Sequence, residues 1–370
     1  MKMKVKTQVI GMEPYKPGKP MEEVKQELGL SDVHKLASNE NPYGPSPAVA
    51  EAAAEAVRSP EIYPDGYAAE IRSAVARHLD VNPSQLIFGA GSDEVILMLC
   101  RALLTPETNT VMASPTFSQY KHNAVVEGAE IREVPLKNGY HDLPAMLEQV
   151  DADTRIIWVC NPNNPTGTYT SKEEFETFLK QVPSDVLVVS DEAYIEYVTA
   201  PDYPDTLSLM NEYPNLMVLR TFSKAYGLAS LRIGYGAGST ELVQALDPIR
   251  PPFNTTTMAQ KAAAAALNDQ EYVESCRKEN RKALDEFIAF CHSHGLSYLP
   301  SQTNFLLIDT GIPGDKMFDS LLKKGFIVRS GESLGFPESI RVTAGTKEQN
   351  QLFLQALEES LNENNTLSEK

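Results

Sequence analysis

The sequence predicts an α/β protein with a large domain, built on a mainly parallel sheet flanked by helices, and a smaller α+β domain. The chain of 370 residues is longer than one hydrophobic core usually serves, so two domains are expected. Between residues 40 and 245, short apolar runs without polar alternation alternate with helix-like segments, which is typical of strands buried on both faces. The pattern changes after a proline-rich stretch at 247–252, which is the predicted domain boundary.

This boundary divides the chain into three predicted parts. Residues 1–38, with a proline cluster at 14–20, are expected to form an N-terminal arm or part of the small domain. Residues 39–250 are expected to form the large domain. Residues 251–370 are expected to form the C-terminal small domain.

The elements follow from the hydrophobic pattern. Ser46 and Pro47 supply a cap and a first-turn proline for a helix over 47–58, and a second helix-like stretch covers 92–104. The predicted buried strands are the apolar runs at 85–89, 109–113, 155–160, 185–190 and 215–220. In the C-terminal part we expect helices at 256–267, 270–294, 315–324 and 346–362, and strands at 304–309, 325–329 and 339–343.

Composition excludes several classes of function. The chain has 50 acidic and 33 basic side chains and a net charge of −17, which disfavours binding to nucleic acid or to anionic lipid. The amino terminus has no apolar run of the secretory type, and no stretch of eighteen apolar residues occurs, so we expect a cytoplasmic protein that does not span a membrane.

The spacing of the cysteines and histidines does not match that of metal ligands. The four cysteines include no C-x-x-C pair, so buried free thiols are expected. His292 and His294 are the only close pair of histidines and stand at an apparent helix end, where solvated side chains are more common than ligands. We therefore predict no metal.

Polar residues that follow the predicted strands are the candidates for a site, because ligands of such sheets lie beyond the carboxyl ends of the strands. Glycines 89 and 91 precede Ser92 and Asp93 at a predicted helix start, where amide groups and the helix dipole can bind a phosphate. A plain helix cap by Ser92 explains the same residues equally well. The dinucleotide-binding fingerprint is absent, because Glu94 stands at its third glycine.

Two further strand ends carry polar residues. Residues 161–167, Asn-Pro-Asn-Asn-Pro-Thr-Gly, cannot be helical, and a turn alone would explain most of them. Asp191 and Glu192 follow the next strand, with Tyr194 close behind. A strand that ends in Asp-Glu also occurs in magnesium-dependent nucleotide hydrolases, but the chain has no G-x-x-x-x-G-K-[ST] loop, which disfavours that class.

The last of these strand ends is Thr221-Phe222-Ser223-Lys224, with Arg232 eight residues after the lysine. A lysine after a strand is ordinarily a solvated surface residue. An anion-binding helix start, an amide loop, a strand-end carboxylate and this lysine together are nevertheless what pyridoxal 5′-phosphate (PLP) chemistry needs. The lysine forms a Schiff base with the cofactor, and the carboxylate keeps the pyridine nitrogen protonated.

With these motifs the sequence resembles the fold-type I PLP-dependent aminotransferases, and the resemblance covers nearly its whole length. The resemblance is carried by residues 38–42 (Ser-Asn-Glu-Asn-Pro), residues 161–167, the stretch Ser-Lys-x-x-Gly-Leu-Ala-x-Leu-Arg-x-Gly from Ser223 to Gly234, and residues 340–346 (Ile-Arg-Val-Thr-Ala-Gly-Thr). The two central motifs are specific for the superfamily and less specific for the substrate.

The resemblance implies a role for each cofactor-site residue. Lys224 would carry PLP and then move a proton between substrate and cofactor, Asp191 would pair with the pyridine nitrogen, and Tyr194 with Asn164 would hold the ring oxygen. Phe117 would stack on the ring, although many relatives carry tyrosine there. The phosphate would be held by Ser92, Asp93, Ser223 and Arg232, and by Tyr63 of a neighbouring subunit, which implies a homodimer.

The same resemblance assigns substrate binding to Tyr15, Arg329 and Arg341, whose guanidinium groups suit a carboxylate or a phosphate equally well. Within the family, the similarity is greatest to enzymes of histidine biosynthesis that convert L-histidinol phosphate and 2-oxoglutarate to imidazole acetol phosphate and glutamate. An aromatic or broad-specificity aminotransferase that acts on phenylalanine or tyrosine is the alternative. A cofactor-binding transcriptional regulator on the same fold is disfavoured, because the family pattern already begins at Tyr15 and leaves no room for a DNA-binding domain.

Overall fold

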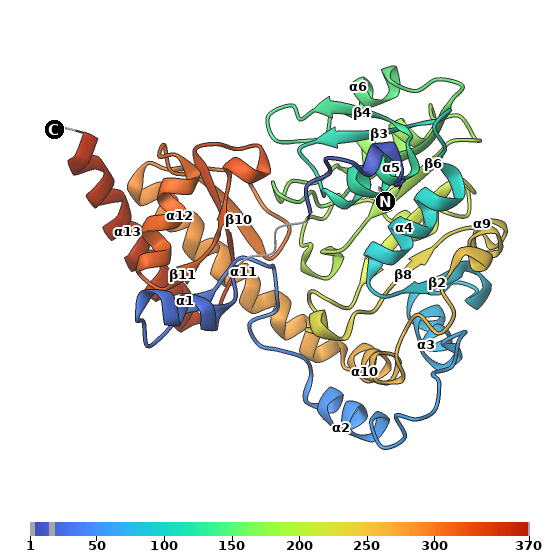
Figure 1. The fold of residues 1–370 in the computed structure, drawn as a ribbon, viewed down its shortest axis with the longest axis horizontal. Helices are drawn as coiled ribbons and strands as arrows, with labels where there is room; N and C mark the ends of the chain where they lie inside the picture. The colour runs from blue at the N-terminus through green and yellow to red at the C-terminus, as the bar shows by residue number, and fades with distance from the viewer. Residues whose placement is uncertain (1–3, 15–18, 369–370) are drawn as a thin grey trace.

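The computed structural model describes residues 4–14 and 19–368 and has two parts, each built around its own sheet (Figure 1). The larger part contains a seven-stranded sheet in the order β2-β8-β7-β6-β5-β3-β4. All its neighbouring strands pair in parallel except β8, which is antiparallel to both β2 and β7. The strands are β2 (Leu86–Gly89), β3 (Asn109–Ser114), β4 (Glu130–Pro135), β5 (Thr154–Cys160), β6 (Leu187–Asp191), β7 (Leu216–Thr221) and β8 (Gly234–Ala237).

Helices cover both faces of this sheet, because successive strand residues point to opposite faces and both sets are apolar. Ile157, Val159 and Val188 share one core cluster with α2 (Pro47–Ala56), α3 (Ala69–Leu79), α6 (Leu143–Glu148), α7 (Lys172–Leu179) and α10 (Thr257–Asn268). Ile156 and Trp158 belong to the cluster on the other face, with α4 (Ser92–Leu103), α5 (Gln119–Glu127) and α9 (Thr240–Leu246). The predicted α/β class with a mainly parallel sheet is confirmed.

The smaller part is an α+β unit (Figure 1, orange and red). Its four-stranded antiparallel sheet has the order β12-β13-β10-β9. The elements are α11 (Gln270–His294), β9 (Ser297–Tyr298), β10 (Phe305–Asp309), α12 (Gly314–Lys323), β11 (Phe326–Ile327), β12 (Arg329–Ser330), β13 (Ser339–Thr343) and α13 (Lys347–Ser368). The long helix α11 runs between the two parts.

The N-terminal segment joins this smaller part. After α1 (Met21–Leu28), β1 (His34–Lys35) pairs in parallel with β11, and Val24 packs in one apolar cluster with Ile327. The chain then crosses to the large part immediately after β1, through residues 37–40. The remaining short elements are α8 (Thr206–Leu209) and six 3-10 turns, at Thr7–Val9, Pro83–Gln85, Ile195–Tyr197, Ala229–Leu231, Asp247–Ile249 and Glu332–Leu334.

Candidate active site

The carboxyl ends of β2, β5, β6 and β7 lie at one edge of the large sheet, because these four strands run in the same direction. The candidate site is built there from the loops that follow them. Each loop contributes a different chemical group, and residues 37–39 and strand β13 approach from the smaller part.

An anion cradle forms at the start of α4. The first-turn amides of a helix, here those of Ser92 and Asp93, have no acceptor within the helix. The Arg232 guanidinium lies beside them, with Nη2 3.6 Å from Asp93 Oδ2 and Nη1 3.5 Å from Ser223 Oγ. Amide donors, a hydroxyl and a cation therefore lie near one another at this helix start, with the Asp93 carboxylate beside the cation, and such donors suit a phosphate.

Glycine is required at two positions of this cradle. Gly91 has φ +82°, and a Cβ atom there would lie 2.8 Å from Arg232 Nη2. A Cβ atom on Gly234, at the start of β8, would lie 2.5 Å from Ser92 N. The two glycines thus keep space for the guanidinium and for the helix start. The close approach of Gly234 to Ser92 explains why the motif that begins at Ser223 ends in glycine.

Asp191 supplies a buried carboxylate at the end of β6. Its side chain accepts a hydrogen bond of 2.6 Å from Tyr120 Oη, and Tyr120 is itself stacked on Trp158 with ring centroids 4.7 Å apart. Burial raises the pKa of Asp191 to about 6. A carboxylate held in this way favours a cationic partner, and a protonated pyridine nitrogen would be one.

Tyr194 and Asn164 place polar groups on the side of the smaller part. The Tyr194 hydroxyl accepts hydrogen bonds from Asn39 Nδ2 at 2.9 Å and from Asn164 Nδ2 at 3.4 Å. Arg341 donates to Asn164 Oδ1, and its Cζ atom lies 4.9 Å from the centroid of the Phe305 ring. Burial raises the pKa of Tyr194, so its hydroxyl keeps its proton at neutral pH.

Lys224 lies between these groups. Its Nζ atom donates to the carbonyl of Ser38 at 3.2 Å and lies 5.7 Å from the centroid of the Tyr194 ring. Burial, and next to it the positive charge of Arg341, lower the pKa of Lys224 from 10.5 to about 8. A useful fraction of the amine is thus neutral, and therefore nucleophilic, near pH 7.

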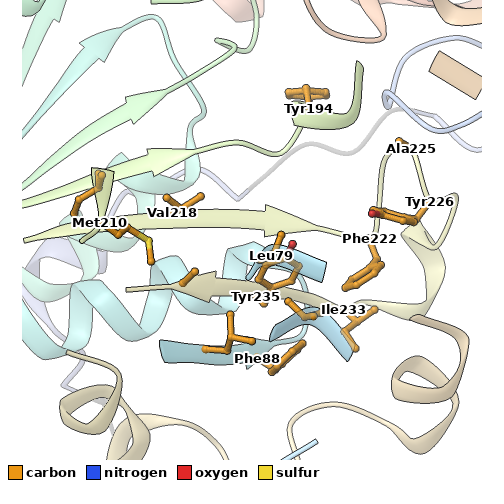
Figure 2. Packing of buried hydrophobic residues seen from close by; sticks show 14 of the residues in the cluster. Leu79, Phe88, Tyr194, Met210, Val218, Phe222, Ala225, Tyr226, Ile233 and Tyr235 are labelled. Carbon is orange, nitrogen blue, oxygen red and sulfur yellow. The ribbon is translucent and has the colours of Figure 1, made fainter. Parts of the chain in front are cut away.

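Aromatic packing holds the loop that carries Lys224. Figure 2 shows Phe222 and Tyr226, which flank the lysine in sequence, together with some of the other buried side chains of this core cluster. Their ring centroids are 4.9 Å apart, and the ring of Phe222 also lies 5.8 Å from that of Tyr235 on β8. The lysine is therefore presented by a fixed turn.

Most of the site residues predicted from the sequence meet at this edge. Phe117 is half-buried and meets Tyr120 edge-on, with ring centroids 5.6 Å apart. Arg329 on β12 stands opposite Arg341 on β13 in the antiparallel register, so the two predicted substrate arginines are neighbours. The residues brought together are Ser92, Asp93, Phe117, Asn164, Asp191, Tyr194, Ser223, Lys224, Arg232, Arg329 and Arg341.

Of the two remaining predicted residues, only Tyr63 lies among the described residues. Tyr63 is 77% exposed and stacks on Phe253, with ring centroids 4.7 Å apart, so this chain does not bring it to its own site. Tyr15 falls outside the described residues. Sequence reasoning also missed Tyr120, the partner of Asp191, whose only signal was an aromatic three residues after Phe117.

The structure also bears on the predictions about metal binding, cysteines and membrane spans. Among the described residues there is no group of three or more His, Cys, Asp or Glu side chains that could hold a metal ion. All four cysteines are buried and free, as predicted. No helix in the described part of the chain is long and apolar enough to cross a membrane. The cytoplasmic location stays a prediction.

The cradle, the buried carboxylate and the partly deprotonated lysine fit one cofactor, PLP, and comparison with known proteins agrees. The chain belongs to the family of class I and II aminotransferases, whose model matches residues 31–357. It is therefore a PLP-dependent transaminase. Its residues supply what the cofactor needs: an anion site for the phosphate, a carboxylate for the ring nitrogen and an amine for covalent attachment.

Within the family, the similarity is to one kind of enzyme. The chain is 59% identical to the histidinol-phosphate aminotransferase of Geobacillus sp. (strain WCH70), over 98% of this chain and 99% of the relative. It is 56% identical to the one of Bacillus subtilis (strain 168), over 97% of this chain and 100% of the relative. The crystal structure of histidinol-phosphate aminotransferase from Sinorhizobium meliloti in complex with pyridoxal-5′-phosphate has a TM-score of 0.90 and 27% identity, over 98% of this chain and 99% of that chain.

Proposed function

We propose that this enzyme transfers the amino group of L-histidinol phosphate to 2-oxoglutarate, which yields imidazole acetol phosphate and glutamate. The observation that carries the proposal is the pair Arg329 and Arg341, which lie opposite each other at the edge that holds Lys224. A guanidinium group can bind a phosphate or a carboxylate through two parallel hydrogen bonds, so one pair can serve both substrates in turn. The names of the curated relatives support the same substrate.

When bound, PLP supplies an electron sink for the bond that breaks at the substrate α-carbon. Lys224 would hold the cofactor covalently and, as an amine with a lowered pKa, would move a proton at the substrate α-carbon. Asp191 would keep the ring nitrogen protonated, and Tyr120 holds the carboxylate in place. Phe117 would pack on the cofactor ring.

The other groups orient cofactor and substrate. Tyr194 and Asn164 would hold the ring oxygen, and the phosphate would be held by the amides of Ser92 and Asp93, by Ser223 and by Arg232. Arg341 binds a substrate anion while it donates to Asn164, which links substrate binding to the ring-oxygen contacts. Tyr15 remains a predicted contact of the substrate.

We further propose that the enzyme is a homodimer in which Tyr63 reaches the phosphate site of the neighbouring subunit. Four large apolar side chains of this chain are exposed: Ile62, Tyr63, Tyr67 and Phe253. The first three are close in sequence, and Phe253 stacks on Tyr63. Exposed apolar side chains that form one contiguous patch often mark an interface. Sedimentation should give a dimer, and Tyr63→Phe should weaken PLP binding; a monomer that binds PLP fully would contradict the arrangement.

The substrate is tested by steady-state comparison of amino donors with 2-oxoglutarate as acceptor. The value of kcat/KM should be much larger for histidinol phosphate than for phenylalanine, and Arg329→Met should reduce the difference. A larger value for phenylalanine would favour an aromatic aminotransferase. Borohydride reduction should fix the yellow chromophore to wild-type protein and not to Lys224→Ala.

A further inference from the structure

Asn39 ties the smaller part of the molecule to the Tyr194 hydroxyl. Its side chain is 2% exposed and donates from Nδ2 to Tyr194 Oη at 2.9 Å. The Asn39 side-chain oxygen, Oδ1, accepts a hydrogen bond of 3.0 Å from Thr343 Oγ1. The backbone N–H of Asn39 donates to the same Thr343 Oγ1 at 3.0 Å. Thr343 therefore fixes which way the Asn39 amide group faces.

The backbone of Asn39 is held as firmly as its side chain. Its φ of +56° is a left-handed conformation that asparagine tolerates better than most residues. Asn304 on the neighbouring turn donates to the Asn39 carbonyl at 3.0 Å. A buried residue with this conformation and four hydrogen bonds is a fixed point of the structure rather than a flexible hinge.

The direction of the hydrogen bonds at Tyr194 has a chemical consequence. A phenol has one proton to donate and two lone pairs that accept. Asn39 and Asn164 both donate to the Tyr194 oxygen, so they occupy its accepting side. The phenol proton is left to donate to an acceptor within the site.

The residues before Asn39 act on the same site through their backbone. The Ala37 carbonyl accepts from Arg341 Nη2 at 2.9 Å, and the Ser38 carbonyl accepts from Lys224 Nζ at 3.2 Å. Three consecutive residues thus contact three site side chains. Of these contacts, only the one made by Asn39 uses a side chain that a substitution can remove.

We propose that Asn39 is a positioning residue, which turns the Tyr194 hydroxyl into a hydrogen-bond donor toward the ring oxygen of the bound cofactor. The proposal rests on the proposed cofactor role of Tyr194 and extends it to a residue that would act on the cofactor through the Tyr194 hydroxyl. Because Asn39 is fixed by Thr343 on β13, the orientation of the hydroxyl depends on how the smaller part is seated.

The effect can be measured on the visible absorption of the enzyme with bound PLP. That absorption changes with pH when the group that joins the cofactor to Lys224 loses its proton. A hydrogen-bond donor at the ring oxygen favours the deprotonated form and lowers the midpoint of the titration. Loss of the Asn39 contact should raise the midpoint by about half a pH unit to one unit, as expected for one hydrogen bond.

Two variants test this from opposite sides. Asn39→Gly removes the side chain and keeps a residue that adopts positive φ without strain. Asn39→Asp keeps the shape but replaces the donor by an acceptor, which would draw the Tyr194 proton away from the cofactor. The midpoint should rise in both, and more in Asn39→Asp.

Controls separate positioning from stability. Asn304→Ala removes a support of the Asn39 backbone without contact to Tyr194, so it should lower the melting temperature and leave the midpoint unchanged. In a Tyr194→Phe background, Asn39→Gly should cause no further shift. If Asn39→Gly does not fold, the Asn39→Asp pair with and without Tyr194→Phe gives the same comparison.

The outcomes distinguish this proposal from the proposed function. A wild-type protein without a PLP chromophore would overturn both. A normal chromophore with a midpoint that Asn39→Gly and Asn39→Asp leave in place, or that they shift equally in the Tyr194→Phe background, would overturn the positioning role alone.

Discussion

The amine of Lys224 should react as a neutral nucleophile at a much lower pH than an ordinary lysine. Burial and the charge of Arg341 both disfavour its protonated form and lower its pKa to about 8. The prediction concerns the protein without cofactor, where the amine is free.

The size of the effect follows from the two pKa values. At pH 7 a group with a pKa of about 8 is neutral in about one molecule in ten, whereas an amine with a pKa of 10.5 is neutral in about three in ten thousand. The reactive form of Lys224 should therefore be about 300-fold more abundant than that of an ordinary lysine. This is the fraction that can attack the cofactor aldehyde.

Acetylation by a trace of acetic anhydride, followed by mass spectrometry of the Lys224 peptide, measures the neutral fraction at each pH. The profile should have its midpoint near pH 8. Arg341→Met should move the midpoint upward, because one positive charge is removed, and leave it below 10.5, because burial is the larger cause. Arg341→Lys keeps the charge and should leave the midpoint near its wild-type value.

A midpoint at or above pH 10 in the wild-type protein would refute this reasoning. An Arg341→Met midpoint equal to that of wild type would show that burial alone sets the pKa. In that case the coupling between Arg341 and Lys224 would have to be abandoned.

Three further predictions concern other parts of the site. Asp191→Asn should lower kcat/KM by about a hundredfold to a thousandfold, since it removes the charge that holds the ring nitrogen protonated. Arg220→Met should lower the free energy of unfolding, measured by urea titration, by about 3–5 kcal/mol, because it leaves the fully buried carboxylate of Glu192 without its ion pair. Gly91→Ala should raise the PLP dissociation constant at least about tenfold, since the added methyl group displaces Arg232, whose bond to a phosphate is charge-assisted.

Matched variants check the last two. Arg281→Met breaks an exposed ion pair with Asp285 and should cost less than about 1 kcal/mol. Gly295→Ala also places a side chain at positive φ, +66°, in the milder left-handed helical region and with no atom within 4 Å, and should leave PLP affinity unchanged. Equal effects in the paired variants would contradict both explanations, and an Asp191→Asn enzyme with more than a tenth of wild-type activity would contradict the first.

The strands that could be predicted from the sequence are those with a continuous apolar run. All five predicted runs of the large sheet became strands, because burial on both faces leaves few polar positions. Strands β4 and β8 escaped prediction for different reasons. β4 lies at the edge and carries Glu130, Arg132 and Glu133, whereas β8 is short and contains Gly234 and Gly236, which ordinarily weaken a strand.

Site residues that follow a strand were predictable by the same logic. Lys224, Asp191 and Asn164 each come directly after a buried run, so topology alone brings them to one edge. Tyr120 was not predictable, because it lies within a helix and reaches Asp191 through space across 71 positions of sequence. An aromatic residue three positions after Phe117 does not by itself indicate such a contact.

The contacts of Asn39 were also not predictable from the local sequence. Its side chain connects Thr343, 304 positions away, with Tyr194, 155 positions away, although its own neighbourhood in the sequence is a short polar linker. The linker crosses from one part of the molecule to the other at the site itself. It must therefore have a fixed conformation and polar groups that can bond to the site residues. Two backbone carbonyl groups of the linker accept hydrogen bonds from Arg341 and Lys224, and the side-chain amide of Asn39 donates one to Tyr194. The junction between the two parts is therefore itself a component of the active site.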